Sequence, residues 1–208
     1  MVGLLRMVVS MNRKPIFDAV RAMLGRGFTQ GEVDELDDAI DEALGIIVVR
    51  APKKKGRQIN QAGERLIKSF EGLELEAYPD PGTGGKPITI GYGATEDMNG
   101  RPFQLGDRIT IAQAERLFDK DTDRFEAAVE KLAPAANDNQ FAALVSFAYN
   151  VGEGEGGLAS STLLKLHNAG DYEGAAEQFA RWKYSGGRPM KGLIRRRAEE
   201  AELYRKPV

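Results

Sequence analysis

Strand-like and helix-like patterns are segregated in this chain, and this segregation limits the folds that it can adopt. Residues 73–78 and 87–92 have the apolar alternation of half-buried strands, and the glycine-rich residues 81–85 join them. From residue 110 onward, apolar residues recur at helical spacing. A small antiparallel sheet beside a mainly helical region predicts the α+β fold class.

Capping residues indicate where the helices begin. Residues whose side-chain oxygen can accept from the first backbone N–H groups of a helix are Asn60, Thr110, Asn137 or Asn139, Ser161 and Asp171. Thr110 also has Gln113 three residues later, the spacing of a capping box. Asn99-Gly100 predicts a tight hairpin turn. The last helix is expected from about residue 192 to residue 204.

The N-terminal part has a different pattern and is expected to form a separate unit. Residues 1–50 contain two amphipathic stretches, of which the second follows a capping box at residues 29–32, and then a short strand pattern at residues 46–49. We expect a helical hairpin, too small to hold a core alone, that acts as a stabilising appendage or, as the family resemblance given below implies, as a cell-wall-binding module. Residues 51–58 form a basic linker, and residues 59–208 form the main domain.

Composition removes several kinds of active site. The chain has no cysteine, so disulfides and thiolate metal sites are excluded. Its single histidine, His167, argues against a histidine zinc site and against a Ser-His-Asp triad, and we expect it to have no functional role. No cofactor and no metal are expected. Carboxylates must therefore carry any acid–base chemistry.

Charge is distributed unevenly along the chain, although the net charge is only −2. The charge is +2 over residues 1–58 (10 basic, 8 acidic), −10 over 59–180 (10 basic, 20 acidic) and +6 over 181–208 (9 basic, 3 acidic). The C-terminal cations favour transient contact with an anionic membrane or wall surface, or are solvated charge on a terminal helix. The linker carries no aromatic residue among its charges, so no nucleic-acid partner is expected, and the protein is expected to be a monomer.

The first residues do not have the pattern of a cleaved signal. Residues 1–9 are apolar but short, and Arg6 interrupts them. Translation can start at Met1 or at Met11, and no stretch approaches the length of a membrane span.

Three polar residues on neighbouring elements suggest acid–base chemistry. Glu71 ends a predicted helix, Asp80 lies in a predicted loop between two prolines, and Thr89 lies on the following strand. Cleavage of an acetal in a sugar polymer needs a proton donor and a second carboxylate that activates water or stabilises the transition state. We expect apolar neighbours to keep Glu71 protonated, Asp80 to stay ionised and Thr89 to orient water. Each residue taken alone is better explained as an ordinary polar surface residue, since the chain has 31 acidic residues.

The sequence around these residues makes the interpretation specific. The motifs are Phe70-Glu71-Gly72, Ala77-Tyr78-Pro79-Asp80, Ile88-Thr89-Ile90-Gly91-Tyr92-Gly93, the helix pattern over residues 139–152, Trp182 and Arg195-Arg196-Arg197-x-x-Glu200. With them, residues 59–206 resemble the phage-type lysozymes of glycoside hydrolase family 24, which include the phage endolysins. Two departures are a longer loop at residues 82–86 and Ala94 where many members have a histidine.

The resemblance implies a lysozyme-like fold and hydrolysis of the β-1,4 bond between N-acetylmuramic acid and N-acetylglucosamine in peptidoglycan. It implies that Glu71 is the general acid and that Asp80 and Thr89 complete the catalytic group. It also implies synthesis in the host bacterial cytoplasm, followed by action in the periplasm or cell wall during lysis. The partner would be bacterial peptidoglycan.

Five further residues are candidates for substrate binding. Tyr92 and Gly93 follow the threonine strand, where a glycine allows close backbone approach or forms a bulge. The amides of Asn139, Gln140 and Asn150 can line a glycan cleft, because amides pair with N-acetyl and hydroxyl groups, or they can cap and cross-link helices.

Two other functions remain open from the sequence. A non-catalytic wall-binding or virion structural protein could keep the same fold, but the presence of all three residues of the Glu71, Asp80 and Thr89 set argues against it. A lytic transglycosylase needs the glutamate but no water-activating aspartate, so Asp80 and Thr89 favour hydrolysis.

Overall fold

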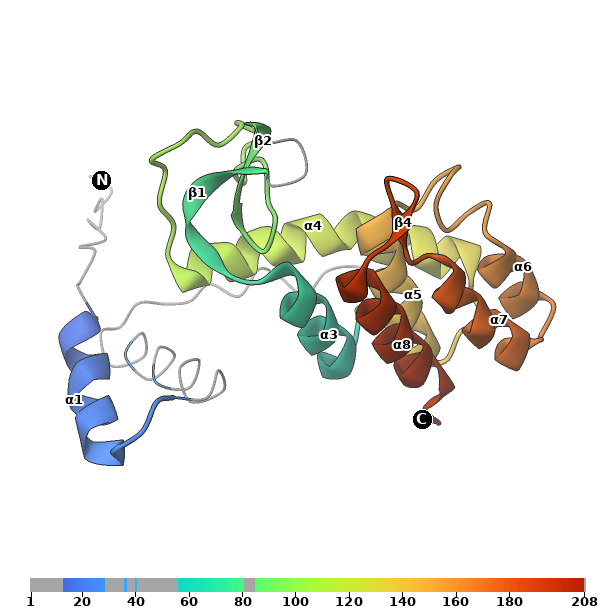
Figure 1. The fold of residues 1–208 in the computed structure, drawn as a ribbon, viewed down its shortest axis with the longest axis horizontal. Helices are drawn as coiled ribbons and strands as arrows, with labels where there is room; N and C mark the ends of the chain where they lie inside the picture. Colours follow the sequence, from blue (N-terminus) through green and yellow to red (C-terminus); the bar gives the residue numbers. More distant parts are fainter. Residues whose placement is uncertain (1–12, 29–35, 37–39, 41–55, 81–84, 208) are drawn as a thin grey trace, which may run out of the picture. The chain divides into compact units, whose positions relative to one another are not determined.

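The computed structural model describes residues 13–28, 36, 40, 56–80 and 85–207 (Figure 1). The chain divides into two compact units, residues 1–50 and residues 51–208. Among the described residues, no helix combines the length and apolarity that crossing a bilayer requires.

The first unit contains helix α1, Lys14–Leu24, which corresponds to the first of the two amphipathic stretches expected within residues 1–50. Gly25 ends α1 in the left-handed conformation (φ 65°) and donates its N–H to the carbonyl of Arg21. Phe17 and Phe28 pack edge to face, with ring centroids 5.5 Å apart. Residues 36 and 40 are also helical. The expected capping box at residues 29–32, the strand at 46–49 and most of the linker lie outside the described residues.

The second unit has a small sheet followed by helices, so the predicted α+β organisation is confirmed (Figure 1). Its elements in chain order are α3 (Gln61–Glu71), β1 (Glu74–Asp80), β2 (Gly85–Gly91), α4 (Ile111–Leu132), α5 (Asp138–Val151), α6 (Thr162–Asn168), α7 (Tyr172–Gln178), the 3-10 helix η1 (Phe179–Arg181), β3 (Tyr184–Ser185), β4 (Arg188–Pro189) and α8 (Lys191–Arg205). The long helix α4 runs from the sheet β1–β2 to the helical region.

Strands β1 and β2 form an antiparallel pair that corrects one expectation. Tyr78 pairs with Thr89, Pro79 with Ile88 and Asp80 with Gly85, and the register shifts between Pro79 and Asp80. Asp80 is therefore the last residue of β1 and not a loop residue. On its other edge, β1 forms a bridge between Glu76 and Arg108, and Pro79, which has no N–H to donate, lies beyond this bridge near the end of the strand.

The helix starts follow the predicted caps. Asn60, Thr110, Ser161 and Asp171 each accept a backbone N–H at the start of a helix, and Thr110 forms its capping box with Gln113. The cap of α5 is Asn137 and not Asn139, because Gln140 reaches back to the N–H of Asn137 in a second capping box. Asn99-Gly100 lies in a turn, with Gly100 at φ 80°.

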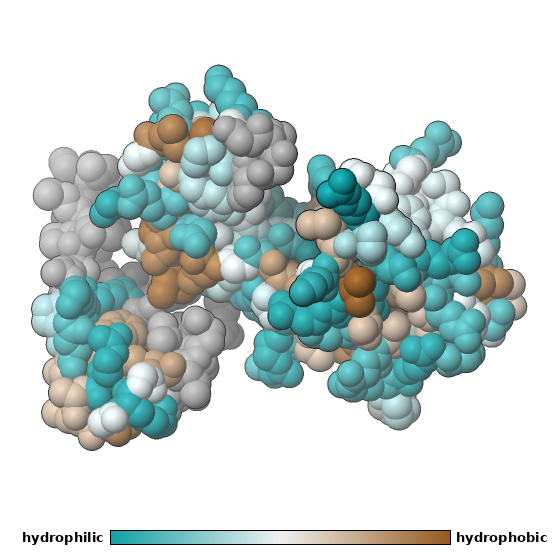
Figure 2. All heavy atoms as spheres, viewed as in Figure 1, coloured by the Kyte–Doolittle hydropathy of each residue, from teal (hydrophilic) through white to brown (hydrophobic). Residues whose placement is uncertain are grey.

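Helix α5 is the centre of the core. Its residues from Gln140 to Ala148 are all buried, and it packs against α3, α4 and α8. A helix that is apolar on every side can only be accommodated inside the protein. In contrast, hydrophilic side chains cover most of the visible face of α7 and α8 (Figure 2).

The end of the predicted linker belongs to the second unit. Arg57 donates from Nη1 to the carbonyl of Ala136 at 2.6 Å, and its guanidinium lies 4.5 Å from the ring centroid of Phe141. It also pairs with Asp138. A guanidinium stacks favourably on an aromatic face, so Arg57 is held at the start of α5 and is not a solvated spacer residue.

Gly63 determines how closely α3 approaches α5. A Cβ atom placed on Gly63 would lie 2.6 Å from Cβ of Ala142 and 3.3 Å from its Cα. The two helices can therefore cross at this distance only with glycine at position 63. Because α3 ends at Glu71, this crossing also positions that carboxylate.

Gly63→Ala is expected to destabilise the protein. Alanine has a helix propensity about 1 kcal/mol more favourable than that of glycine. Inserting a methyl group into a packed helix crossing, however, costs about 1–3 kcal/mol. The new methyl group would lie 2.6 Å from Cβ of Ala142, which is attached directly to the backbone and cannot rotate away. Urea denaturation should show a lower free energy of unfolding. Gly154→Ala is the control, since nothing lies within 4 Å of that position. Equal or greater stability of Gly63→Ala would contradict the close crossing.

His167 is buried against the last helix. It is 2% exposed, its Nδ1 lies 2.5 Å from the hydroxyl of Tyr204, and its ring contacts Tyr172. Its Nε2 has no partner among the described residues. Burial lowers the pKa of His167, because the charged imidazolium would lose its hydration.

Stability should therefore fall in mild acid. Below about pH 6.5, His167 binds a proton in the unfolded chain more readily than in the folded protein. The stability that the neutral, buried histidine provides at neutral pH is therefore lost as the pH falls through the lowered pKa of the folded state. The free energy of unfolding should drop less between pH 7 and pH 5 (roughly the titration range of histidine) in His167→Gln than in the wild type. The chain has only one histidine, so no other imidazole confuses the comparison. Parallel pH dependences in the two proteins would refute this account.

Candidate active site

Glu71 lies where the helix α3 meets a cavity. It is the last residue of α3, and Gly72 (φ 74°) ends the helix. Its side chain is 23% exposed, and it lines a cavity of about 400 Å³ together with Asn150, Ser185, Met190 and Arg196. A half-buried carboxylate in a cavity of this kind is a candidate for acid–base chemistry.

The neighbour of Glu71 is a cation. Arg196 of α8 donates from Nη1 to Oε1 of Glu71 at 2.6 Å, and its side chain is only 4% exposed. Its Nη2 donates to the carbonyl of Ser146 at 3.2 Å. The expectation of an apolar environment around Glu71 is therefore wrong at Oε1, where the contact is an ion pair.

A second carboxylate compensates the buried arginines. Glu200 is fully buried, and its Oε1 accepts from Nε of Arg196 at 3.2 Å and from the hydroxyl of Ser146 at 2.8 Å. Its Oε2 lies 2.9 Å from Nε of Arg197. Burial raises the pKa of Glu200 and lowers the pKa of Arg197 to about 10. Helix α8 thus presents a compact ion cluster to α3 and α5.

The sequence placed these residues in a motif but did not assign Arg196 and Glu200 to the site. The i, i+4 spacing of Arg196 and Glu200 puts both side chains on one face of a helix, and this spacing indicates an ion pair between them. Arg195, in contrast, is exposed and lies 3.6 Å from Glu199. Only packing distinguishes the buried arginine from the exposed one.

Gly93 is a predicted site residue that approaches Glu71. It has φ 100°, and a Cβ atom placed on it would lie 4.0 Å from Oε2 of Glu71. The backbone of this turn therefore lies against the carboxylate, in a conformation that favours glycine.

Tyr92 contributes to the core and to this turn. It is 7% exposed, packs edge to face on Phe118, and donates its hydroxyl to Oε1 of Glu115 at 2.9 Å. Its carbonyl accepts from the hydroxyl of Tyr149 at 3.1 Å. Hydrogen bonds thus hold both the side-chain hydroxyl and the backbone carbonyl of Tyr92.

Thr89 and Asp80 lie on the paired strands. Thr89 is half-buried on β2, and its hydroxyl is 3.4 Å from the carbonyl of Tyr78. Asp80 ends β1 opposite Gly85. The side chain of Asp80 and residues 81–84, which include most of the longer loop, lie outside the described part of the chain.

Asn139 and Gln140 lie away from this cavity. Asn139 accepts from Asn60 at 2.9 Å and donates to the carbonyl of Pro207 at 3.0 Å, while Gln140 completes the cap of α5. Asn60 and Glu71 flank α3 at opposite ends, and 11 residues of α-helix span about 16 Å. The amides of Asn139 and Gln140 therefore cap and cross-link helices.

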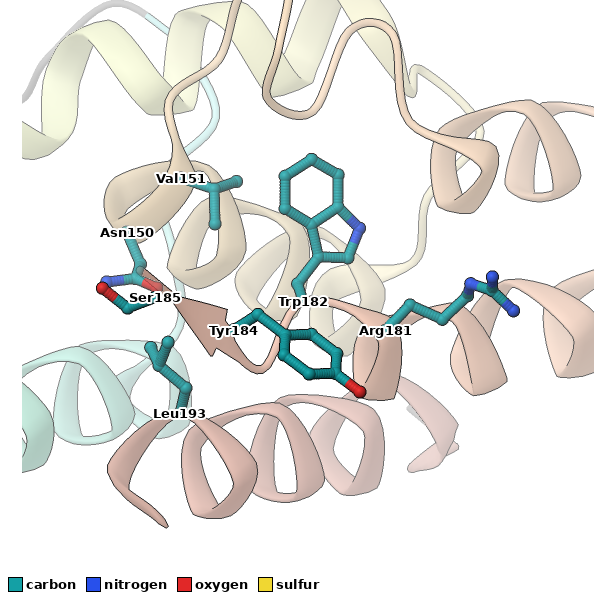
Figure 3. A pocket seen from close by; sticks show the side chains of 7 residues that line it. All are labelled: Asn150, Val151, Arg181, Trp182, Tyr184, Ser185 and Leu193. Carbon is teal, nitrogen blue, oxygen red and sulfur yellow. The ribbon is translucent and has the colours of Figure 1, made fainter. Parts of the chain in front are cut away.

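Asn150 is the amide that the structure brings to the cavity. It lies near the end of α5 and accepts from Nη2 of Arg197 at 3.0 Å. It also lines a second cavity, of about 470 Å³, that shares Asn150, Ser185 and Leu193 with the first (Figure 3). The two cavities are thus adjoining parts of one groove.

Two aromatic residues, Trp182 and Tyr184, line the second cavity. Trp182 packs edge to face on Phe147, with centroids 5.1 Å apart, and also lines the cavity beside the exposed Tyr184 (Figure 3). The hairpin β3–β4, which carries Tyr184, was not predicted from the sequence. Gly186 and Gly187 have φ 55° and 76°, and a glycine pair of this kind is a signal for a two-residue hairpin.

The fold and the helix-end carboxylate in this groove define a lysozyme-like protein. Residues 68–200 match the family described as "Phage lysozyme", and the chain belongs to this family. The resemblance found in the sequence and the lysozyme-like fold class are both confirmed. Within the described residues, no group of three His, Asp or Glu side chains could hold a metal ion.

Several proteins are similar to this chain. An endolysin of Bacillus phage B103 is 46% identical over 148 residues, which cover 70% of this chain and 53% of that protein, so this chain spans about half of its length. An endolysin structure from Escherichia coli O157:H7 phage FAHEc1 is 39% identical, with a TM-score of 0.65, and covers 73% of this chain and 96% of that chain. A P22 lysozyme structure is 34% identical, with a TM-score of 0.63, over 71% of this chain and 98% of that chain.

Removing Arg196 should leave Glu71 without its cation, and Glu200 with Arg197 as its cationic partner. Arg196→Met is expected to lower the free energy of unfolding by about 3–5 kcal/mol, the usual cost of breaking a buried ion pair from one side. Arg195→Met is the matched control on the same helix; its side chain is 66% exposed, so its loss should stay within about 1 kcal/mol. Urea denaturation measures both. Similar small losses for the two variants would show that the cluster contributes little.

Proposed function

We propose that this chain is an endolysin that hydrolyses the β-1,4 bond between N-acetylmuramic acid and N-acetylglucosamine in bacterial peptidoglycan and so lyses the host cell. Membership of the phage lysozyme family supports this. The observation that carries the proposal is Glu71, a carboxylate at a helix end, anchored by Arg196 inside a groove that is open to solvent.

Glu71 is the general acid in this proposal. Cleavage needs a proton delivered to the glycosidic oxygen from a fixed direction. Arg196 holds Oε1, while Oε2 faces the turn at Gly93, so one oxygen is anchored and the other is directed toward the sheet side of the groove. A fixed orientation of the acid increases the rate of cleavage, because proton transfer requires the donor and the acceptor to be within hydrogen-bonding distance.

Asp80 and Thr89 position or activate water, or stabilise the transition state. Thr89 pairs with Tyr78, two residues before Asp80, so the two candidates are neighbours in the sheet. Asn150, Gly93 and the backbone at Tyr92 are the proposed glycan contacts. Residues 59–208 would carry catalysis, and residues 1–50 would serve as an accessory or wall-binding unit of a monomeric protein.

Glu71→Gln tests the assignment directly. Loss of the proton donor should lower the rate at which peptidoglycan suspensions clear by roughly 10²–10⁴-fold, with an unchanged circular dichroism spectrum. Glu74→Gln makes the same charge change on an exposed residue three positions later and should clear suspensions at the wild-type rate. Undiminished clearing by Glu71→Gln would refute the proposal.

Product chemistry separates hydrolysis from transglycosylation. Water as the acceptor leaves one new reducing end and one new non-reducing end at each cleaved bond, whereas attack by the C6 hydroxyl of the same sugar leaves a 1,6-anhydro end in place of the reducing end. We expect mass spectrometry of digested peptidoglycan to detect reducing ends. Anhydro products would identify the enzyme as a lytic transglycosylase and would remove the proposed roles of Asp80 and Thr89.

A further inference from the structure

We infer that Tyr149 is a positioning residue for the proposed reaction: its hydroxyl holds the carbonyl of Tyr92 and so fixes the turn at Gly93 against the carboxylate of Glu71. This inference rests on the proposed function and adds a residue that acts through the backbone of the groove and not through the substrate. It concerns a contact between α5 and the turn after β2, two elements far apart in the sequence.

The ring of Tyr149 is itself held rigidly. It lies near the end of α5, and its centroid is 5.2 Å from that of Phe125 and 6.1 Å from that of Phe118, both on α4. Aromatic neighbours on the long helix therefore leave its hydroxyl little freedom of direction. The hydroxyl donates to the carbonyl of Tyr92 at 3.1 Å.

The turn that receives this hydrogen bond has little stiffness of its own. Gly91 (φ 65°) and Gly93 (φ 100°) flank Tyr92, and glycine loses the most conformational freedom on folding. Two backbone bonds between Ile90 and Ala94, each 2.9 Å, close the turn at its base. The carbonyl of Tyr92 is fixed at the tip by Tyr149, so this hydrogen bond restrains the part that faces Glu71.

Tyr149 remains a hydrogen-bond donor at every pH suited to lysis assays. Burial, and after it the charge of Glu71, raises the pKa of Tyr149; Asp121 adds to this, while Arg196 and Arg124 oppose it.

Tyr149→Phe removes a single oxygen and leaves the ring between its aromatic neighbours. With the turn freed, the groove wall beside Glu71 shifts, and the apparent kcat on dye-labelled peptidoglycan should fall on the order of tenfold, since small misplacements are costly in proton transfer. The apparent KM should rise by less than kcat falls, because the turn that carries the proposed glycan contacts at Tyr92 and Gly93 is loosened and not removed.

Tyr204→Phe is the matched control. The hydroxyl of Tyr204 is also buried and bonded, to His167, but it lies eight residues beyond Arg196 on α8. It should lose a similar amount of stability and keep the wild-type kcat. Wild-type kcat in Tyr149→Phe, or an equal fall in both variants, would overturn the inference.

Amide hydrogen exchange tests the inference independently of activity. The N–H groups of Gly93 and Ala94 both donate to the carbonyl of Ile90. They should exchange faster in Tyr149→Phe and at the wild-type rate in Tyr204→Phe. An inactive wild-type protein with this exchange difference would refute the proposed function but keep the restraint on the turn. Unchanged exchange at Gly93 and Ala94 would refute the restraint itself.

Discussion

The buried ion cluster around Arg196 is the interaction on which the groove depends. A guanidinium that is 4% exposed would be very costly if it were unpaired, and here it meets Glu71 from α3, Glu200 from its own helix and the carbonyl of Ser146 from α5. Satisfying this one side chain requires the three helices to stay together. The same contact holds Glu71 at the wall of a cavity. The ion pair that stabilises the packing of the helices therefore also fixes the geometry of the proposed active site.

The groove walls are held by contacts that lie outside it. Gly63 lets α3 pack closely on α5, and the cap at Asn60 fixes where α3 begins, so that the helix ends at the cavity. On the sheet side, Tyr149 restrains the turn at Gly93. The proposed acid is thus positioned by the packing of α3 on α5 and by the turn at Gly93, in addition to its ion pair with Arg196.

Local patterns were predicted well because they depend on neighbours in the sequence. Caps such as Thr110 and Ser161 were found where the structure has them, since an N-cap is decided within four residues. The prolines on both sides of Asp80 predict a loop, whereas the structure pairs Asp80 with Gly85, and this pairing cannot be inferred from local sequence. The pairing of Arg196 with Glu71 spans 125 residues and Asn139 pairs with Asn60 across 79, so neither could be inferred without the packing of helices.

The central claim is that Arg196 and Glu71 are energetically coupled, and a double-mutant cycle measures this most directly. The free energies of unfolding of the wild type, Glu71→Gln, Arg196→Met and the double variant give the coupling term. We expect an interaction energy of about 1–3 kcal/mol, as for residues in one ion-pair network. Additivity of the two single effects within about 0.5 kcal/mol would contradict the account, because it would mean that the contact does not hold the carboxylate in place.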